Sequence, residues 1–348
     1  MNSKLRGGLF GCGMISEHHL RAWSRIPEVE IVALGNRTVE RAEQRRREFA
    51  PAARVYSDLR LMLEREDLDF IDILTAPALH REHCLMAKQA GVHIICQKPL
   101  CNTLGEAQEL AHAMSRYPRL FAVHENHRHR PWFQTIDSQY RSGGFGKVSL
   151  VRLEHLNARE PAEAYKLAAG EGVLLEYGSH LVDMMRQLLG EPLRVYARTH
   201  HLNPAVKAES LVHAVYEYPE TTAIVDVAWK HAAITQGSAL VAGSEGEAYF
   251  EGTMTRGDAS RLRIWRNGSI IRDEHRSVME DYADSFYAFE RECADIMLGR
   301  GKAARRVEEY MQTLICTFAA YESAERGAIV EIPREANWVP SGGSSPGE

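Results

Sequence analysis

The stretch Leu5-Arg6-Gly7-Gly8-Leu9-Phe10-Gly11-Cys12-Gly13-Met14-Ile15-Ser16 decides the fold prediction. Its first six residues are typical of a short buried strand, and a helical pattern begins at Ile15. Gly11 permits a tight turn, Gly13 lets a pyrophosphate come close to the backbone, and the helix N-terminus offers N–H groups to an anion. We therefore predict a dinucleotide site that includes Gly11, Gly13, Met14 and Ile15. A plain strand-to-helix turn is the alternative interpretation.

Strand-like and helical segments alternate through the first third of the chain. The predicted strands are Leu5–Phe10, Val29–Leu34, Phe70–Leu74, Val92–Cys96 and Leu120–Val123. The predicted helices are Ile15–Arg25, Val39–Phe49, Ala78–Ala90 and Leu104–Tyr117. Such alternation favours an α/β domain with a doubly wound parallel sheet of the Rossmann type, which we place at residues 1–125.

The pattern changes after Arg141-Ser142-Gly143-Gly144, where strand-like segments follow one another with few helices between them. The predicted strands are Val148–Leu156, Leu193–His200, Leu211–Tyr218, Ala223–Trp229, Arg261–Arg266 and Ser269–Asp273. Asn267-Gly268 predicts a type I′ hairpin between the last two of these strands. Helices are expected at Leu174–Leu189, Tyr282–Leu298 and Val307–Arg326. We predict an α+β domain with a large, mostly antiparallel open sheet at residues 126–340, followed by a disordered tail at 341–348.

Composition excludes several classes of protein. The chain has 348 residues, of which 45% are hydrophobic and 26% charged, and its formal net charge is −5. It therefore has no global basic field to attract nucleic acid. No stretch approaches the roughly 18 apolar residues that span a bilayer, and the N-terminus lacks the apolar region of a secretory signal. The six cysteines form no Cys-x-x-Cys pair, so we expect thiols and a cytoplasmic location.

The second predicted strand ends in Gly35-Asn36-Arg37, which bears on the choice of dinucleotide. An acidic residue at this point would bind the adenosine ribose of NAD and repel the 2′-phosphate of NADP. Asn36 can still bond the ribose but does not repel a phosphate. Arg37 could attract a phosphate, or it could be solvated or stacked on adenine. We predict NAD as the cofactor and leave NADP open.

Two further motifs indicate a family. Gln97-Lys98-Pro99 follows the predicted strand Val92–Cys96, and the segment 172–183 contains Glu176-Tyr177-Gly178-Ser179-His180-Leu181-Val182-Asp183. Together with Gly11-x-Gly13, they resemble the Gfo/Idh/MocA family of sugar and cyclitol dehydrogenases. The resemblance extends to His124–Arg128, Tyr165-Lys166 and Gly243–Gly246. The chain departs from the family at Gln97, where an acidic residue is usual, and at Glu176, where an Asp is usual.

The resemblance implies a hydride transfer from a small sugar to a nicotinamide cofactor. An imidazole titrates near neutrality, so we expect His180 to accept the hydroxyl proton. Lys98 would stabilise the developing alkoxide, and Glu176, four residues before His180 on a helix, would orient His180 or bind a sugar hydroxyl. The residues predicted to bind the cofactor also include Thr75, Pro77, His80, Gln97, Lys98, Asn126 and Lys166. The residues predicted to bind the substrate are Lys98, Asn126, Asn157, Tyr165, Glu176 and His180.

Several alternatives accompany this prediction. His124, His127 and His129 invite a metal hypothesis, but the cations Arg128 and Arg130 between them oppose it, and we expect no metal site. The cofactor could instead cycle internally in a glycosidase-like reaction. The chain could also be a non-catalytic sensor of dinucleotide or sugar. By the same resemblance, we expect a homodimer or homotetramer formed through the sheet of the second domain.

Overall fold

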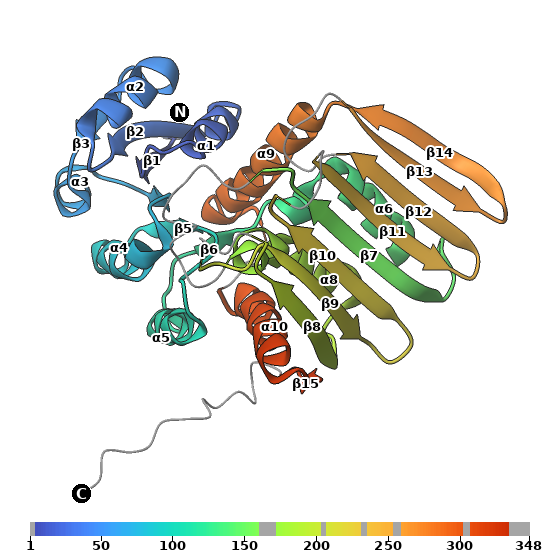
Figure 1. Ribbon diagram of the computed structural model, residues 1–348. Helices are drawn as coiled ribbons and strands as arrows, with labels where there is room; N and C mark the ends of the chain where they lie inside the picture. The colour runs from blue at the N-terminus through green and yellow to red at the C-terminus, as the bar shows by residue number, and fades with distance from the viewer. Residues whose placement is uncertain are drawn as a thin grey trace, which may run out of the picture.

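The computed structural model describes residues 4–159, 172–202, 207–230, 235–252, 259–301 and 307–333. Within these ranges the chain forms two sheets that lie side by side, each with its own helices (Figure 1). The predicted tail at 341–348 lies outside the described residues. No helix of the described part is both long and apolar enough to cross a bilayer.

The first sheet has six parallel strands in the order β3-β2-β1-β4-β5-β6, as a doubly wound fold requires. Its strands are β1 (Leu5–Phe10), β2 (Val29–Gly35), β3 (Arg54–Tyr56), β4 (Phe70–Ile73), β5 (His93–Gln97) and β6 (Phe121–His124). Its helices are α1 (Ser16–Ser24), α2 (Val39–Phe49), α3 (Leu59–Arg65), α4 (Pro77–Ala90) and α5 (Leu104–Met114). The prediction of a Rossmann-type sheet is confirmed.

The second sheet has nine strands in the order β14-β13-β12-β11-β7-β10-β9-β8-β15. Its strands are β7 (Val148–Leu156), β8 (Arg194–His200), β9 (Leu211–Glu217), β10 (Thr222–Ala228), β11 (Gln236–Gly243), β12 (Gly246–Gly252), β13 (Ser260–Arg266), β14 (Ser269–Arg276) and β15 (Val330–Glu331). Only the pairing of β10 with β7 is parallel within the described sheet, so the predicted mostly antiparallel sheet is confirmed.

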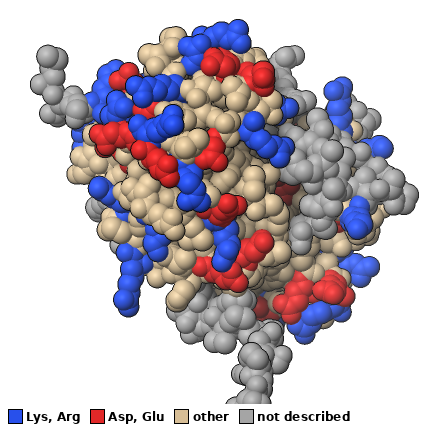
Figure 2. Space-filling model, turned by 90° about the vertical axis from the view of Figure 1, so that its left-hand side faces the viewer, with Lys and Arg blue, Asp and Glu red and all other residues tan. Residues whose placement is uncertain are grey.

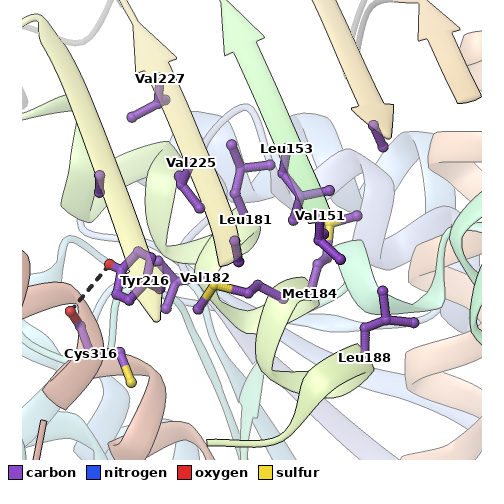
Figure 3. Close-up of a cluster of buried hydrophobic side chains, with 14 of the residues drawn as sticks. Val151, Leu153, Leu181, Val182, Met184, Leu188, Tyr216, Val225, Val227 and Cys316 are labelled. Atoms are coloured by element: carbon purple, nitrogen blue, oxygen red, sulfur yellow. Dashed lines mark hydrogen bonds between the residues drawn. The ribbon is translucent and has the colours of Figure 1, made fainter. Parts of the chain in front are cut away.

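Helices cover one face of this second sheet (Figure 1): α6 (Pro131–Arg141), α8 (Ser179–Leu189) and α10 (Val307–Arg326). Figure 3 shows how Leu181 and Val182 of α8 meet the inward side chains of β7 and β10. Tyr216 packs in the same cluster, and its hydroxyl donates to the carbonyl oxygen of Cys316 at 3.3 Å. Burying an aliphatic side chain such as Leu181 or Val182 stabilises the fold by about 1.5–3 kcal/mol relative to leaving it exposed. This core fixes the start of α8, where the predicted His180 lies.

Helix α9 (Val278–Met297) joins the two halves of the molecule. It runs between the two sheets (Figure 1) and packs against α1 of the first domain. A buried hydrogen bond of 2.7 Å from Asn126 Nδ2 to Ser285 Oγ ties the chain after β6 to this helix. The charged surface over the first domain carries both signs interspersed (Figure 2), and many of its side chains are paired, as Arg45 with Glu48 at 2.8 Å.

Candidate active site

The loop after β1 has the geometry that a dinucleotide needs. Gly11 has a φ of 115°, and a Cβ there would lie 2.5 Å from the carbonyl carbon of Leu74. Only glycine therefore lets this loop pass the end of β4. A Cβ on Gly13 would meet none of the described atoms within 4 Å, and Met14 beside it is 60% exposed. Ile15 occupies the N-cap position of α1 and makes no side-chain capping hydrogen bond, so its side chain does not occupy the N–H groups that could bind an anion.

Asn36 follows β2 and forms a hydrogen bond with the loop after β1. Its Oδ1 accepts from the backbone N–H of Cys12 at 3.0 Å, and its Nδ2 donates to the carbonyl oxygen of Thr38 at 2.8 Å. The first contact joins the loops after β1 and β2, the second lies within the loop after β2, and Arg37 is exposed. The structure thus brings Asn36 and Arg37 to the same edge of the sheet as Gly11 and Gly13.

The loops after β4 and β5 are held together by His80. This buried side chain on α4 places Nε2 2.8 Å from the carbonyl oxygen of Thr75, and Nδ1 3.1 Å from those of Pro99 and Leu100. Burial lowers the pKa of His80 to about 4, so the imidazole is neutral and its single N–H donates to the carbonyl oxygens on one side only. Thr75 and Pro77, at the first turn of α4, border the same edge.

Lys98 extends from the end of β5 toward the second domain. Its ammonium donates to the carbonyl oxygen of Glu176 and lies 3.5 Å from Oε1 of the same residue. The backbone N–H of Lys98 donates to Oε1 of Gln97 at 2.7 Å. Glu176 therefore positions the Lys98 ammonium, since the neighbouring Gln97 has no charge to do so.

Glu176 belongs to η2 (Leu174–Gly178), a π-helical turn directly before α8. Glu209 holds its start: Oε1 accepts from the N–H of Leu174 at 2.9 Å and from the hydroxyl of Tyr321 at 2.8 Å. A π turn has more residues than an α turn, so the four-residue spacing from Glu176 to His180 does not stack the two side chains as an α-helix would. Such turns are frequent at functional sites.

His180, on the first turn of α8, faces Glu125. Its Nδ1 contacts Oε1 of Glu125, and both side chains are buried, at 5% and 4% exposure. Burial, more than any neighbouring charge, lowers the pKa of His180 and raises the pKa of Glu125. The imidazole of His127 stacks on that of His180, with ring centroids 3.9 Å apart. Glu125 was not predicted from the sequence, and it takes the place against His180 that was considered for Glu176.

The remaining predicted residues are placed less centrally. Asn126 is buried and bonded to Ser285 of α9, as described above. Asn157, at the end of β7, accepts at Oδ1 from the N–H of Arg159 and from the hydroxyl of Thr235, both at 3.1 Å. Tyr165 and Lys166 lie outside the described residues. The structure thus brings Lys98, Glu125, Glu176 and His180 together.

Comparison with known proteins decides the family. The model described as "Oxidoreductase family, NAD-binding Rossmann fold" matches residues 5–125, and the model "GFO/IDH/MocA C-terminal domain" matches residues 133–249. The chain belongs to the Gfo/Idh/MocA family. Its first domain is thus an NAD-binding Rossmann domain, which confirms the predicted cofactor class.

Two curated relatives of this Gfo/Idh/MocA protein are both named D-apiose dehydrogenase. The chain is 35% identical to the one from Paraburkholderia graminis over 230 residues, which span 65% of this chain and 61% of that relative's length. It is 26% identical to the one from Rhizobium rhizogenes, over 95% of this chain and 98% of the relative.

Solved structures of other proteins share the fold. An oxidoreductase from Agrobacterium radiobacter, solved in complex with NAD+, L-tartaric acid and magnesium, has a TM-score of 0.84 at 24% identity and covers 95% of this chain and 99% of its own. Levoglucosan dehydrogenase in complex with NADH and L-sorbose has a TM-score of 0.81 at 21% identity, with 95% of this chain and 100% of its own covered.

Proposed function

We propose that this chain uses NAD to oxidise a hydroxyl of a small sugar, and that its substrate is D-apiose, which becomes D-apionolactone. The names of the two curated relatives support the substrate. So does the resemblance of Gly11–Glu17, Gly35–Thr38, Ile95–Pro99 and His124–Arg128 to D-apiose dehydrogenase. The observation that carries the chemistry is the buried contact of His180 with Glu125, beside the ammonium of Lys98.

Oxidation of a carbinol requires that a proton leave the hydroxyl as the hydride leaves the carbon. NAD, when bound at the loop of Gly11 and Gly13, would supply the acceptor for this hydride. His180 accepts the proton: Nδ1 faces Glu125, which leaves Nε2 for the substrate hydroxyl. The carboxylate of Glu125 then stabilises the imidazolium that forms, because opposite charges attract strongly where water is excluded.

Lys98 acts on the oxygen that loses this proton. Its ammonium, only 11% exposed and held by Glu176, stabilises negative charge on the developing alkoxide. Asn126, Asn157, Tyr165 and Lys166 complete the proposed contacts to sugar and cofactor. Another aldose or a cyclitol would use the same proton acceptor, so the identity of the sugar is tested separately from the chemistry.

The test is the appearance of NADH absorbance when purified protein is mixed with NAD and a panel of aldoses, branched pentoses and cyclitols. We expect the highest kcat/KM with D-apiose. A higher value with another sugar would replace the substrate and keep the mechanism. Binding of NAD by calorimetry without turnover on any member of the panel would contradict the proposal and favour a sensor.

A homodimer or homotetramer through the second sheet is part of this proposal. The face opposite α8 carries no described helix (Figure 1). Apolar side chains from adjacent strands, Leu150, Ile224 and Leu240, lie half-buried on it, and the charged pair Arg152 and Asp226 interrupts them. Mass by light scattering tests this, and a monomer at micromolar concentration would contradict it.

A further inference from the structure

Four buried polar side chains meet where α9 packs against the first domain. His19 comes from α1, Asp72 from β4, His124 from β6 and Glu290 from α9, and each is 0% exposed. Three of them thus belong to the Rossmann domain and one to the helix that bridges to the second sheet (Figure 1). None of the four belongs to the set that handles the substrate proton.

Much of the hydrogen-bonding capacity of this cluster is unused. Both ring nitrogens of His124, both carboxylate oxygens of Glu290 and Oδ1 of Asp72 have no hydrogen-bond partner among the described residues. A buried carboxylate without a partner costs several kcal/mol, so native proteins pair such groups with a cation or a donor. A bound cation would satisfy several of these five buried polar atoms at once.

The spacing of these atoms suits a metal ion. Oε1 of Glu290 lies 3.4 Å from Nδ1 of His19 and 3.9 Å from Nε2 of His124. One ligand atom from each of these three residues lies within 4.8 Å of the others. Ligand atoms bound at about 2.0–2.2 Å around a tetrahedral ion lie about 3.3–3.6 Å apart, so a small closure completes the site.

We propose that His19, His124 and Glu290 bind a divalent transition-metal ion of the zinc class. Oδ2 of Asp72 is hydrogen-bonded to Nδ1 of His19 at 2.8 Å, so Nδ1 loses this proton when it binds the ion, and Asp72 stays beside the site as a second buried carboxylate. Two imidazole nitrogens and one carboxylate oxygen form a donor set that zinc accepts, and the carboxylates of Glu290 and Asp72 balance its charge. Ligands from α1, β6 and α9 would fasten α9 to the Rossmann domain.

The surroundings of the cluster supply a second layer of contacts. The indole Nε1 of Trp23 donates to Oδ2 of Asp72 at 2.9 Å, which fixes that carboxylate. The ring of Phe289 lies 4.3 Å from that of His124 and excludes water. Nε2 of Gln97 lies 3.1 Å from Nε2 of His19, so Gln97 also contacts the ring of one proposed ligand.

The proposed site differs from the expectation of no metal site, which concerned His124, His127 and His129. His127 and His129 are absent from the proposed site. Its other ligands lie 105 residues before and 166 residues after His124, a separation that no local spacing reveals. The competing explanation is a metal-free cluster in which Glu290 is protonated, because burial raises the pKa of Glu290 and lowers that of His124.

The experiment compares the full-length protein with two glutamine variants of α9. Glu290→Gln removes a proposed ligand and keeps its shape, while Glu280→Gln changes an exposed carboxylate of the same helix and serves as the control. Each protein is incubated with zinc chloride and then dialysed, and its zinc content is measured by atomic emission. Thermal unfolding is recorded with zinc and with the chelator dipicolinate.

We expect one equivalent of zinc in the wild type and in Glu280→Gln, and close to none in Glu290→Gln. Zinc should raise the Tm of the first two proteins relative to chelator and leave that of Glu290→Gln unchanged. A wild type without zinc, or Glu290→Gln with the wild-type content, overturns the proposal. If Glu290→Gln does not fold, His124→Gln is assessed by the same criteria, and an unaltered zinc content there has the same meaning.

Discussion

Replacing Glu125 by Gln tests the proton-accepting pair most directly. The amide keeps an oxygen for Nδ1–H of His180 but has no charge to stabilise the imidazolium. Both side chains are nearly buried, at 4% and 5% exposure, so solvent cannot supply that charge. Breaking a buried ion pair costs about 3–5 kcal/mol. If this cost falls on the transition state, kcat should drop by about 10²–10⁴-fold, at about 1.4 kcal/mol per decade.

The pH profile distinguishes this role from a structural one. Oxidation of the sugar requires the pair of His180 and Glu125 to accept a proton. The pair is therefore active only when His180 is neutral and Glu125 is ionised. Burial raises the pKa of Glu125 to about 8, so kcat/KM of the wild type should fall as the pH drops below about 8. In Glu125→Gln only His180 titrates, and burial lowers its pKa. The fall of kcat/KM should therefore move to lower pH in this variant.

The assay measures initial NADH formation from the best sugar of the panel between about pH 6 and 10, a range that spans the predicted limb. The affinity for NAD, from calorimetry, should be unaltered in Glu125→Gln and shows that the variant is folded. Glu176→Gln is the matched control, since its carboxylate lies against Lys98. In Glu176→Gln, kcat/KM should fall below the same pH as in the wild type. A Glu125→Gln variant with the turnover and the pH limb of the wild type would refute the proposed pair.

Three further substitutions test the site. His180→Ala should lower turnover by about 10²–10⁴-fold while NAD binding persists, and unchanged turnover in rapid kinetics would remove His180 as the base. Lys98→Met should leave NAD affinity nearly intact and suppress hydride transfer; normal single-turnover reduction would exclude Lys98 from the chemistry. Gly11→Ala would place a Cβ 2.5 Å from the carbonyl carbon of Leu74 at a φ of 115°, so calorimetry should show weakened NAD binding and a thermal melt a lower Tm. Wild-type affinity and Tm would show that the loop relaxes without cost.

Local chemistry explains which elements the sequence predicts well. Asn267-Gly268 was expected to form a type I′ turn, and the structure gives φ values of 49° and 77° there, as that turn requires at both positions. A helix was predicted to end at Ala90, and Gly91 directly after it caps α4 in the left-handed conformation at a φ of 74°. In both places a few adjacent residues determine the backbone, so no distant contact is needed to predict it.

The sequence analysis gave no range for β11 or β12, nor for β3, α3 and α6, and the last three carry a weak signal or one masked by function. Strand β3 has only three residues, and none of them is fully buried. Helix α3 buries only Leu59 and Met62, and its clearest mark is the Asp58 side chain that accepts from the N–H of Leu61 at 3.0 Å. Helix α6 starts at Pro131, directly after the His-rich segment. Pro at the first helical position is a recognised signal for a helix start, and it was present in the sequence.

Glu125 could have been predicted from the sequence with one more step of topology. Strands β5 and β6 are parallel neighbours, and Gln97 pairs with His124 in their register. The residue after each, Lys98 and Glu125, therefore leaves the sheet at the same edge and on adjacent strands. Predicting a parallel order places a carboxylate beside the proposed catalytic lysine, although 27 positions separate them. What the sequence could not supply is His180: its contact with Glu125 depends on how the second domain packs against this edge through the π turn and α8.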